Sequence, residues 1–192
     1  MARMIRPALL FSALLCWLMP VSALALPPGT PSFWVGGDIA GTQLSKLGGA
    51  WDSNNFDDVS TAVRVNFGYR ERTPFGVEGS LGSLGRYRGT NRDVEYSLAS
   101  LSLVGHLPLG SEASFYGRLG GGAIYVRSEG QRDTKPAGIL GLGLQFELSR
   151  LFAMRAGFDI HSFSTSINEA GDKSDRNNQR LDIAYIGFKY RF

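Results

Sequence analysis

Apolar and polar side chains alternate with a period of two along most of the chain that follows residue 30. The end of the chain shows this most clearly. One face of the final segment carries Ala184, Ile186, Phe188, Tyr190 and Phe192, and the other carries Ile183, Tyr185, Gly187, Lys189 and Arg191. Successive side chains of a β-strand point to opposite faces, whereas apolar positions on a helix recur every three or four residues. The pattern therefore predicts strands.

Eight segments follow this pattern. They span residues 33–44, 59–71, 75–87, 94–107, 113–127, 137–148, 151–165 and 181–192. Each has ten or more residues, which is the length of a tilted strand that crosses a membrane. Strands of ordinary globular proteins average about 5–6 residues. The segments are therefore expected to span a membrane.

The connections between these segments alternate between short and long. The short ones are residues 71–74, 108–112 and 149–150, and the longer, polar ones are residues 45–58, 88–93, 128–136 and 166–180. An even strand number with alternating short and long links is typical of outer-membrane barrels, whose short turns face the periplasm. The sequence thus predicts an all-β fold, an eight-stranded antiparallel up-and-down transmembrane β-barrel with both ends of the barrel domain on the periplasmic side.

The apolar face could point outward to lipid, or inward around a ligand as in a secreted lipocalin-like barrel. Aromatic residues near the strand ends favour the outward direction, because membrane barrels carry aromatic girdles. They are Phe115, Tyr125, Phe152, Tyr190 and Phe192. The opposite faces carry a set of mutually compatible charges. This predicted lumenal charge network comprises Asp38, Arg64, Glu78, Arg118, Glu147, Arg155 and Asp159.

Eight strands leave a lumen that side chains can fill. A charge pair inside it is partly desolvated, so each charge needs a partner or water. Strand neighbourhood predicts that Glu147 lies close to Arg155, and that Glu78 and Arg118 join them across the lumen. Two interpretations stay open, a polar filling that closes the barrel and a gated pore.

The first 25 residues have the features of a secretory signal peptide. Arg3 and Arg6 precede an apolar run over residues 8–19. The small residues Ala23 and Ala25 then stand at positions −3 and −1 of the expected cleavage site. The alternative, a membrane anchor helix, would need about 20 apolar residues. We expect residues 1–25 to be removed and residues 26–192 to form the barrel domain. Cleavage removes Cys16 and two arginines, which lowers the formal net charge from +3 to +1.

Several stretches resemble the OmpA-type eight-stranded transmembrane domain. They are Phe75-Gly76-Val77-Glu78-Gly79, Leu84-Gly85-Arg86, Tyr116-Gly117-Arg118-Leu119-Gly120-Gly121, Gln145-Phe146-Glu147 and the ending Gly187-Phe188-Lys189-Tyr190-Arg191-Phe192. The resemblance implies a Gram-negative outer-membrane location and a lipid and lipopolysaccharide environment. It also implies insertion by the barrel assembly machinery, which in this family reads a terminal aromatic signal. Here the matching residues are Phe188, Tyr190 and Phe192.

The family's lumenal switch uses two acids, an arginine and a lysine. Glu78, Glu147 and Arg155 look like the acids and the arginine, whereas the lysine's expected position looks like Val104. The peptidoglycan-binding periplasmic domain of OmpA is expected to be absent.

No catalytic, cofactor or metal site is expected. Some eight-stranded barrels modify lipid A with a His-x-Ser pair on one strand face, but here Ser162 directly follows His161 and should point the other way. Two histidines and no basic stripe argue against a nucleic-acid partner. Arg86, Arg88 and Arg92 are candidate contacts for lipopolysaccharide phosphates, because arginine pairs well with phosphate.

The leading functional expectation is a structural or surface-interaction barrel, adhesin-like or OmpA-like, that binds an unidentified surface ligand through loops such as residues 166–180. The alternative is a narrow porin-like channel for ions or small solutes, and a lipid A-modifying enzyme is a remote third.

Overall fold

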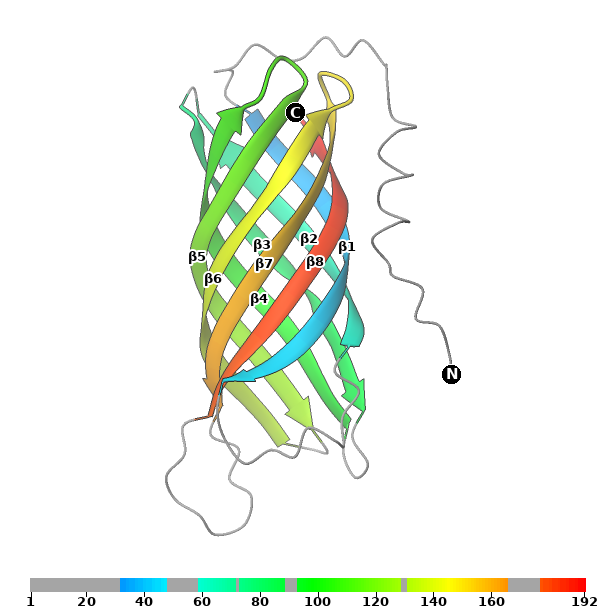
Figure 1. The fold of residues 1–192 in the computed structure, drawn as a ribbon, viewed down its shortest axis with the longest axis vertical. Helices are drawn as coiled ribbons and strands as arrows, with labels where there is room; N and C mark the ends of the chain where they lie inside the picture. The colour runs from blue at the N-terminus through cyan, green and yellow to red at the C-terminus, as the bar shows by residue number, and fades with distance from the viewer. Residues whose placement is uncertain (1–31, 48–58, 72, 89–92, 129–130, 166–176) are drawn as a thin grey trace, which may run out of the picture.

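The computed structural model describes residues 32–47, 59–71, 73–88, 93–128, 131–165 and 177–192. Eight strands run through them: β1 (Ser32–Leu47), β2 (Val59–Arg70), β3 (Phe75–Arg88), β4 (Asp93–Pro108), β5 (Ala113–Ser128), β6 (Gln131–Glu147), β7 (Phe152–Thr165) and β8 (Asn177–Arg191). Each strand pairs antiparallel with the next, and β1 pairs with β8, so the sheet closes into a barrel (Figure 1). In this part of the chain, no helix is long and apolar enough to cross a membrane.

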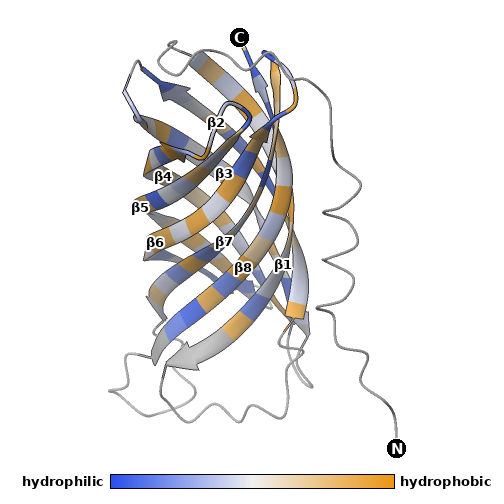
Figure 2. Cartoon of the chain, turned by 45° about the horizontal axis from the view of Figure 1, so that its top comes forward, coloured by the Kyte–Doolittle hydropathy of each residue, from blue (hydrophilic) through white to orange (hydrophobic). Residues whose placement is uncertain are grey.

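The two faces of the sheet divide the residue types as the alternation predicts. Large apolar side chains such as Ile39, Leu101, Leu119 and Leu140 are more than half exposed on the outer surface. Charged and polar side chains point inward from the positions between them, and Figure 2 shows the resulting alternation along the strands. An apolar exterior is stable only in lipid. The expected eight-stranded barrel with its apolar face outward is confirmed.

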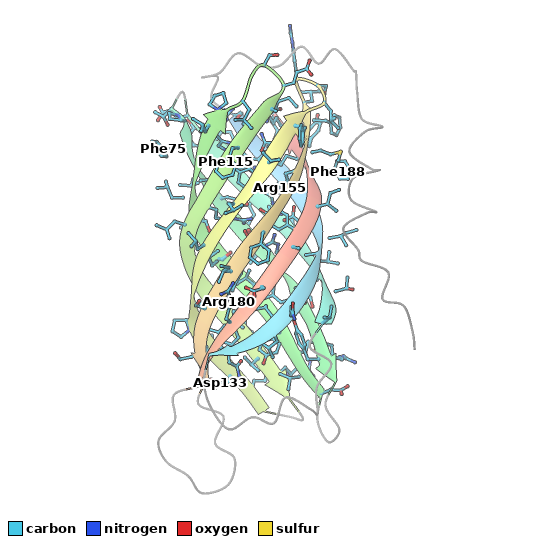
Figure 3. All side chains as sticks on the ribbon, in the orientation of Figure 1. Phe75, Phe115, Asp133, Arg155, Arg180 and Phe188 are labelled. Atoms are coloured by element: carbon cyan, nitrogen blue, oxygen red, sulfur yellow. The ribbon has the colours of Figure 1, made fainter. Side chains whose placement is uncertain are left out.

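The three short connections lie at one end of the barrel, together with the end of β8 (Figure 1). The backbone N–H of Phe192 donates to the carbonyl of Phe33 at 3.0 Å, which brings the end of the chain beside the start of β1. We call this the short-turn end. Figure 3 shows Phe75, Phe115 and Phe188 toward this end and Asp133 at the opposite one.

One expected loop is not found. Residues 128–136 were predicted as a long polar connection, but β5 and β6 pair as far as Ser128 and Gln131 and leave only residues 129–130 between them. A strand that projects beyond the membrane meets water on its outer face and loses the apolar half of its alternation. The polar residues Arg132 to Lys135 are such an extension. The strand β8 likewise begins at Asn177, earlier than expected.

A β-bulge interrupts β3 near the end opposite the short turns. Ser83 pairs with Ser97 and Gly85 pairs with Tyr96, so β3 contains one extra residue. Gly85 has φ = +108°, which residues with a side chain rarely adopt. The Ser60 hydroxyl stabilises the backbone of the bulge. It donates to the Arg86 carbonyl and accepts from the Arg86 N–H, both at 3.0 Å.

Gly85→Ala is expected to lower the free energy of unfolding by about 1–3 kcal/mol, since the positive φ strains the backbone. The added Cβ would also lie 2.6 Å from the Ser60 Cβ. Urea titration in lipid vesicles measures the change. Gly117→Ala is the matched control, because its Cβ would meet nothing within 4 Å. Equal losses in the two variants would contradict the role of the bulge.

Candidate functional site in the lumen

Six of the seven residues of the predicted charge network come together in the middle of the lumen. They are Asp38 on β1, Arg64 on β2, Glu78 on β3, Arg118 on β5, and Arg155 and Asp159 on β7. All are at most 4% exposed. Each lies on the inward face of its strand because its neighbours along the strand face lipid. With Lys189, described below, we call these residues the charged layer.

Arg155 on β7 joins two acids, Asp38 on β1, two strands away around the barrel, and Glu78 on β3, on the opposite side. Its Nε and Nη2 donate to the two oxygens of Asp38 at 2.9 and 2.8 Å. Its Nη1 donates to both oxygens of Glu78 at 2.9 and 2.7 Å. Two-pronged pairing of this kind uses the planar geometry of the guanidinium group. Arg155 therefore ties β7 to β1 and β3 across the lumen.

Two further arginines complete the charged layer. Arg64 donates to Asp159 at 2.6 Å and to Asp38 at 3.1 Å. Arg118 donates to Glu78 and to Asp159, both at 3.0 Å. Every acid of the layer thus accepts hydrogen bonds from two arginines, which compensates the cost of taking its charge out of water.

Glu147 does not join the layer, so the expected contact with Arg155 is wrong. Its carboxylate pairs with Arg191, with the Nη2 of Arg191 2.6 Å from Oε1. The register between β6 and β7 explains the difference. Gln145 lies opposite Arg155, whereas Glu147 lies opposite Ala153, two residues nearer the short-turn end.

The residues that the sequence analysis missed come mainly from β8. The Lys189 Nζ lies 3.3 Å from Oε2 of Glu78, and Val104, at the lysine's expected position, is buried in the lumen. The Tyr185 hydroxyl accepts a bond from Arg118 at 2.7 Å and lies 2.5 Å from the Tyr116 hydroxyl. The sequence shows which residues of β8 face inward. It does not show which strand across the lumen each of them contacts.

Lys189 gives the layer four cations against three acids. Its ammonium also lies 4.5 Å from the centre of the Trp34 ring, a cation–π contact. A cavity of about 10 Å³ lies beside it toward the short-turn end, with Trp34, His106 and Gln145 among its lining residues. Such a cavity has room for about one water molecule.

Beyond the charged layer the lumen is mostly apolar, with the buried polar side chains of Thr42, His161 and Gln179 among the apolar ones. The alternation in the sequence did not predict this change. The inward side chains there form what we call the apolar plug: Leu84, Tyr87, Val94, Tyr96, Leu98, Ile124, Val126, Phe163 and Leu181. The Tyr96 ring centre lies 5.5 Å from that of Tyr87 and 5.9 Å from that of Phe163, so rings from three strands meet. The Tyr87 hydroxyl donates to the hydroxyl of Thr42 at 2.8 Å. The expected polar filling thus occupies only part of the lumen.

The residues weighed for lipid A chemistry are not arranged for catalysis. His161 is buried in the lumen and Ser162 is exposed on the outer face. Neither ring nitrogen of His161 has a hydrogen-bond partner in the described part of the chain, and Asp159 bonds to arginines instead. Within the described residues, no three histidine, cysteine or acidic side chains are grouped to hold a metal ion.

The remaining candidates lie on the outer surface or outside the described residues. Arg86 is exposed at the end opposite the short turns, whereas the side chain of Arg88 and all of Arg92 lie outside the described residues, as do residues 166–176 and the expected signal peptide. Phe188 and Phe192 are exposed on the outer face. The Tyr190 ring packs between Phe152 and Phe192, with centres 5.0 and 5.1 Å away.

Comparison with solved structures finds the same architecture in bacterial outer-membrane proteins. Neisserial surface protein A (NspA) matches with a TM-score of 0.60 and 18% identity, over 83% of this chain and 97% of NspA. Ail, the attachment invasion locus protein of Yersinia pestis, solved with the heparin analogue sucrose octasulfate, matches with a TM-score of 0.55 and 18% identity, over 85% of this chain and 99% of Ail. The N-terminal β-barrel of Pseudomonas aeruginosa OprF matches with a TM-score of 0.51 and 15% identity, over 82% and 97%.

No curated protein matches the chain. The sequence does match a family described as "Outer membrane protein beta-barrel domain" over residues 11–192. This match covers almost the whole chain, and the closed barrel with its apolar exterior agrees with it. The chain therefore belongs to the outer membrane protein β-barrel family and is an integral barrel of the Gram-negative outer membrane.

Proposed function

We propose that this chain is a structural or surface-interaction barrel whose lumen is closed to ions and solutes. One observation carries the proposal: two different fillings lie one above the other in the same lumen. The charged layer occupies the middle, and the apolar plug fills the end opposite the short turns. In an outer-membrane barrel the short turns face the periplasm, so the plug lies on the extracellular side.

The two fillings oppose ion passage for different physical reasons. An ion crossing the charged layer would have to separate pairs such as Arg155–Glu78, whose desolvated charges cannot be left without partners. An ion crossing the apolar plug would lose its hydration shell among carbon atoms, with few polar groups to replace it. Both barriers must be removed before the lumen can conduct.

A narrow channel is the second candidate. The polar groups of the charged layer and the small cavity near Lys189 favour it, because they continue toward the periplasmic end. A liposome-swelling assay with small sugars and amino acids separates the two candidates. The closed barrel predicts no swelling above that of protein-free vesicles, and swelling in proportion to the folded protein would favour the channel.

The terminal aromatic residues are proposed to serve assembly. The exposed positions of Phe188 and Phe192 support this, since a recognition signal must be accessible before insertion. Phe192→Ala is expected to lower the assembled fraction in cells severalfold, as read by heat-shifted gel mobility of outer-membrane fractions. Phe75→Ala, which removes another exposed ring at the same end, is the control. Normal assembly of the Phe192 variant would contradict the proposal.

Surface ligands are proposed to bind at the extracellular end, where the long connections join the strands. Ail, a barrel of similar fold, was solved in complex with the heparin analogue sucrose octasulfate. Sucrose octasulfate is therefore a reasonable first probe for this chain.

A further inference from the structure

Four charged residues form a row across four strands on the outer face of the barrel. The strand registers pair Arg86 with Glu95, Glu95 with Arg127, and Arg127 with Arg132. Directly paired positions on one face place their side chains side by side. The row therefore gathers three arginines and one glutamate near the extracellular ends of β3, β4, β5 and β6.

The bulge in β3 places Arg86 in this row. Before the bulge, the odd-numbered residues Leu81 and Ser83 face outward. The extra residue shifts the alternation by one, so Arg86 faces outward and Tyr87 enters the lumen. Without the bulge, Arg86 would point into the apolar plug. Re-aiming a side chain is a common use of bulges.

Among the residues that the structure describes, Arg86 is the one arginine of the row with an ion-pair partner, Glu95. Arg86 and Glu95 approach only to 3.9 Å, with side chains 57% and 39% exposed. Arg127 and Arg132 have no ion pair among the residues that the structure describes. Two other acids lie nearby: Asp133 pairs with Lys135 at 2.9 Å, and Asp93 is exposed two residues beyond Glu95 on β4. Among the described residues, no acid therefore neutralises Arg127 or Arg132, and their guanidinium groups are available to an anion from outside.

The row lies at the height of the outer-leaflet head groups. On β5, the outward rings of Phe115 and Tyr125 are ten residues apart. At a rise of 3.4 Å per residue and a tilt of 40°, they are separated by about 26 Å along the membrane normal, close to the apolar band of about 25 Å. Arg127 lies about 5 Å farther out by the same arithmetic, just beyond the hydrocarbon.

The surface below the row changes in two steps. The next paired positions carry hydroxyl groups, on Ser83, Ser97, Tyr125 and Thr134. Toward the membrane centre, the exposed side chains of Leu81 and Leu101 stand in the next two rows, and the five other positions of these rows on β4, β5 and β6 carry small side chains or none. These are Ala99, Gly121, Ala123, Pro136 and Gly138.

A hollow of about 430 Å³ opens at the row and the hydroxyl groups, lined by Glu95, Ser97, Tyr125, Arg127, Arg132 and Thr134 among others. At Gly138 an added Cβ would meet nothing within 4 Å, so the surface is open at this position. Cations, hydroxyl groups and an apolar surface thus follow one another along the membrane normal.

We propose that this strip of β3–β6 binds a phosphorylated, acylated glycolipid of the outer leaflet. Arg127 and Arg132 would hold a phosphate, since guanidinium groups pair with it through two hydrogen bonds. The hydroxyl groups would meet the sugar, and the acyl chains would pack over Gly121 and Gly138. The proposal rests on the outer-membrane location and does not depend on whether the lumen conducts.

The opposite side of the barrel offers a matched control. Arg180 on β8 is paired with Asp182 at 2.7 Å on the same outer face. It lies opposite Ser162, which is ten residues beyond Phe152, so its height is comparable to that of Tyr125. This arginine is neutralised by the protein, and no binding is expected there.

The test is native mass spectrometry of the protein refolded in a neutral detergent, titrated with diphosphorylated lipid A. The double variant Arg127→Gln/Arg132→Gln is expected to bind about 25-fold more weakly, at about fivefold for each arginine near the membrane surface. Arg180→Gln should change binding less than twofold. Heat-shifted mobility verifies folding, and Arg127→Gln alone, with a fivefold loss, serves if the double variant does not fold.

Two other probes identify the source of the phosphate. Dephosphorylated lipid A should bind the wild type about as weakly as diphosphorylated lipid A binds the double variant. Inorganic phosphate at millimolar concentration should not compete with diphosphorylated lipid A for the wild type. Unchanged lipid A binding by the double variant, or equal losses in Arg180→Gln, would overturn the proposal. Full competition by inorganic phosphate would also overturn it, because the site would then be a simple anion site.

Discussion

Arg155→Ala is expected to lower the free energy of unfolding by about 3–5 kcal/mol, the usual cost of removing one partner from a buried ion pair. Arg155 is 1% exposed and forms four hydrogen bonds to Asp38 and Glu78. Its removal leaves both carboxylates in the lumen with fewer donors. Arg64, Arg118 and Lys189 still contact them, so the barrel should remain closed.

Urea titration of the folded protein in lipid vesicles measures this loss. The control is Arg180→Ala on the outer face, whose ion pair with Asp182 is 36% and 20% exposed. Exposed pairs contribute about 0–1 kcal/mol. A loss for Arg155→Ala no larger than that of the control would mean that the charged layer does not stabilise the barrel.

Tyr96→Ala is expected to lower the free energy of unfolding by a similar amount, about 3–5 kcal/mol, because it leaves a cavity in a packed core. Tyr96 is 3% exposed and its ring contacts Tyr87 and Phe163. Tyr96→Phe keeps these contacts and loses only the bond to Gln179 at 3.4 Å, so it should cost about 1 kcal/mol or less.

The same variant separates the two barriers in the lumen. Tyr96→Ala weakens the apolar plug but leaves the charged layer intact, so it should not conduct. Combining it with Glu78→Ala, which takes the shared acid from Arg118, Arg155 and Lys189, is expected to open an ion path if the barrel still folds. Conductance of Tyr96→Ala alone would show that the plug is the sole barrier.

The architecture could be predicted from the sequence because lipid imposes a simple rule. The outward side chains of a spanning strand are predominantly apolar. The alternation around Val63 and Leu140 therefore predicts both the strands and their outward faces. Short turns at alternate connections then set the topology. Beyond the membrane the outward side chains no longer have to be apolar, so the alternation disappears. For this reason residues 131–136 were expected to be part of a loop.

The partners inside the lumen could not be predicted in the same way. Alternation shows that Glu147, Arg155 and Lys189 face inward, but contacts across the lumen depend on the stagger between strands. That stagger places Gln145 opposite Arg155, and the Glu147 carboxylate pairs with Arg191 instead. The apolar plug was missed because the inward positions near the extracellular ends, such as Leu84 and Leu98, are as apolar as the outward ones.

The bulge was missed for a related reason. Glycine at position 85 is one of 25 in the chain, and nothing in the local sequence marks it as the residue with a positive φ. One extra residue reverses the two faces of everything that follows in β3. The direction of Arg86 therefore depends on a conformation that only the folded sheet reveals.

Ion conductance in a planar bilayer is the direct test of whether the lumen is closed. The refolded wild-type protein, with its folding verified by heat-shifted gel mobility, is predicted to leave the bilayer silent at salt concentrations and voltages at which a porin conducts. Steady single-channel currents that appear in proportion to the folded protein, and that change in Glu78→Ala, would contradict a closed lumen and make the charged layer part of a pore.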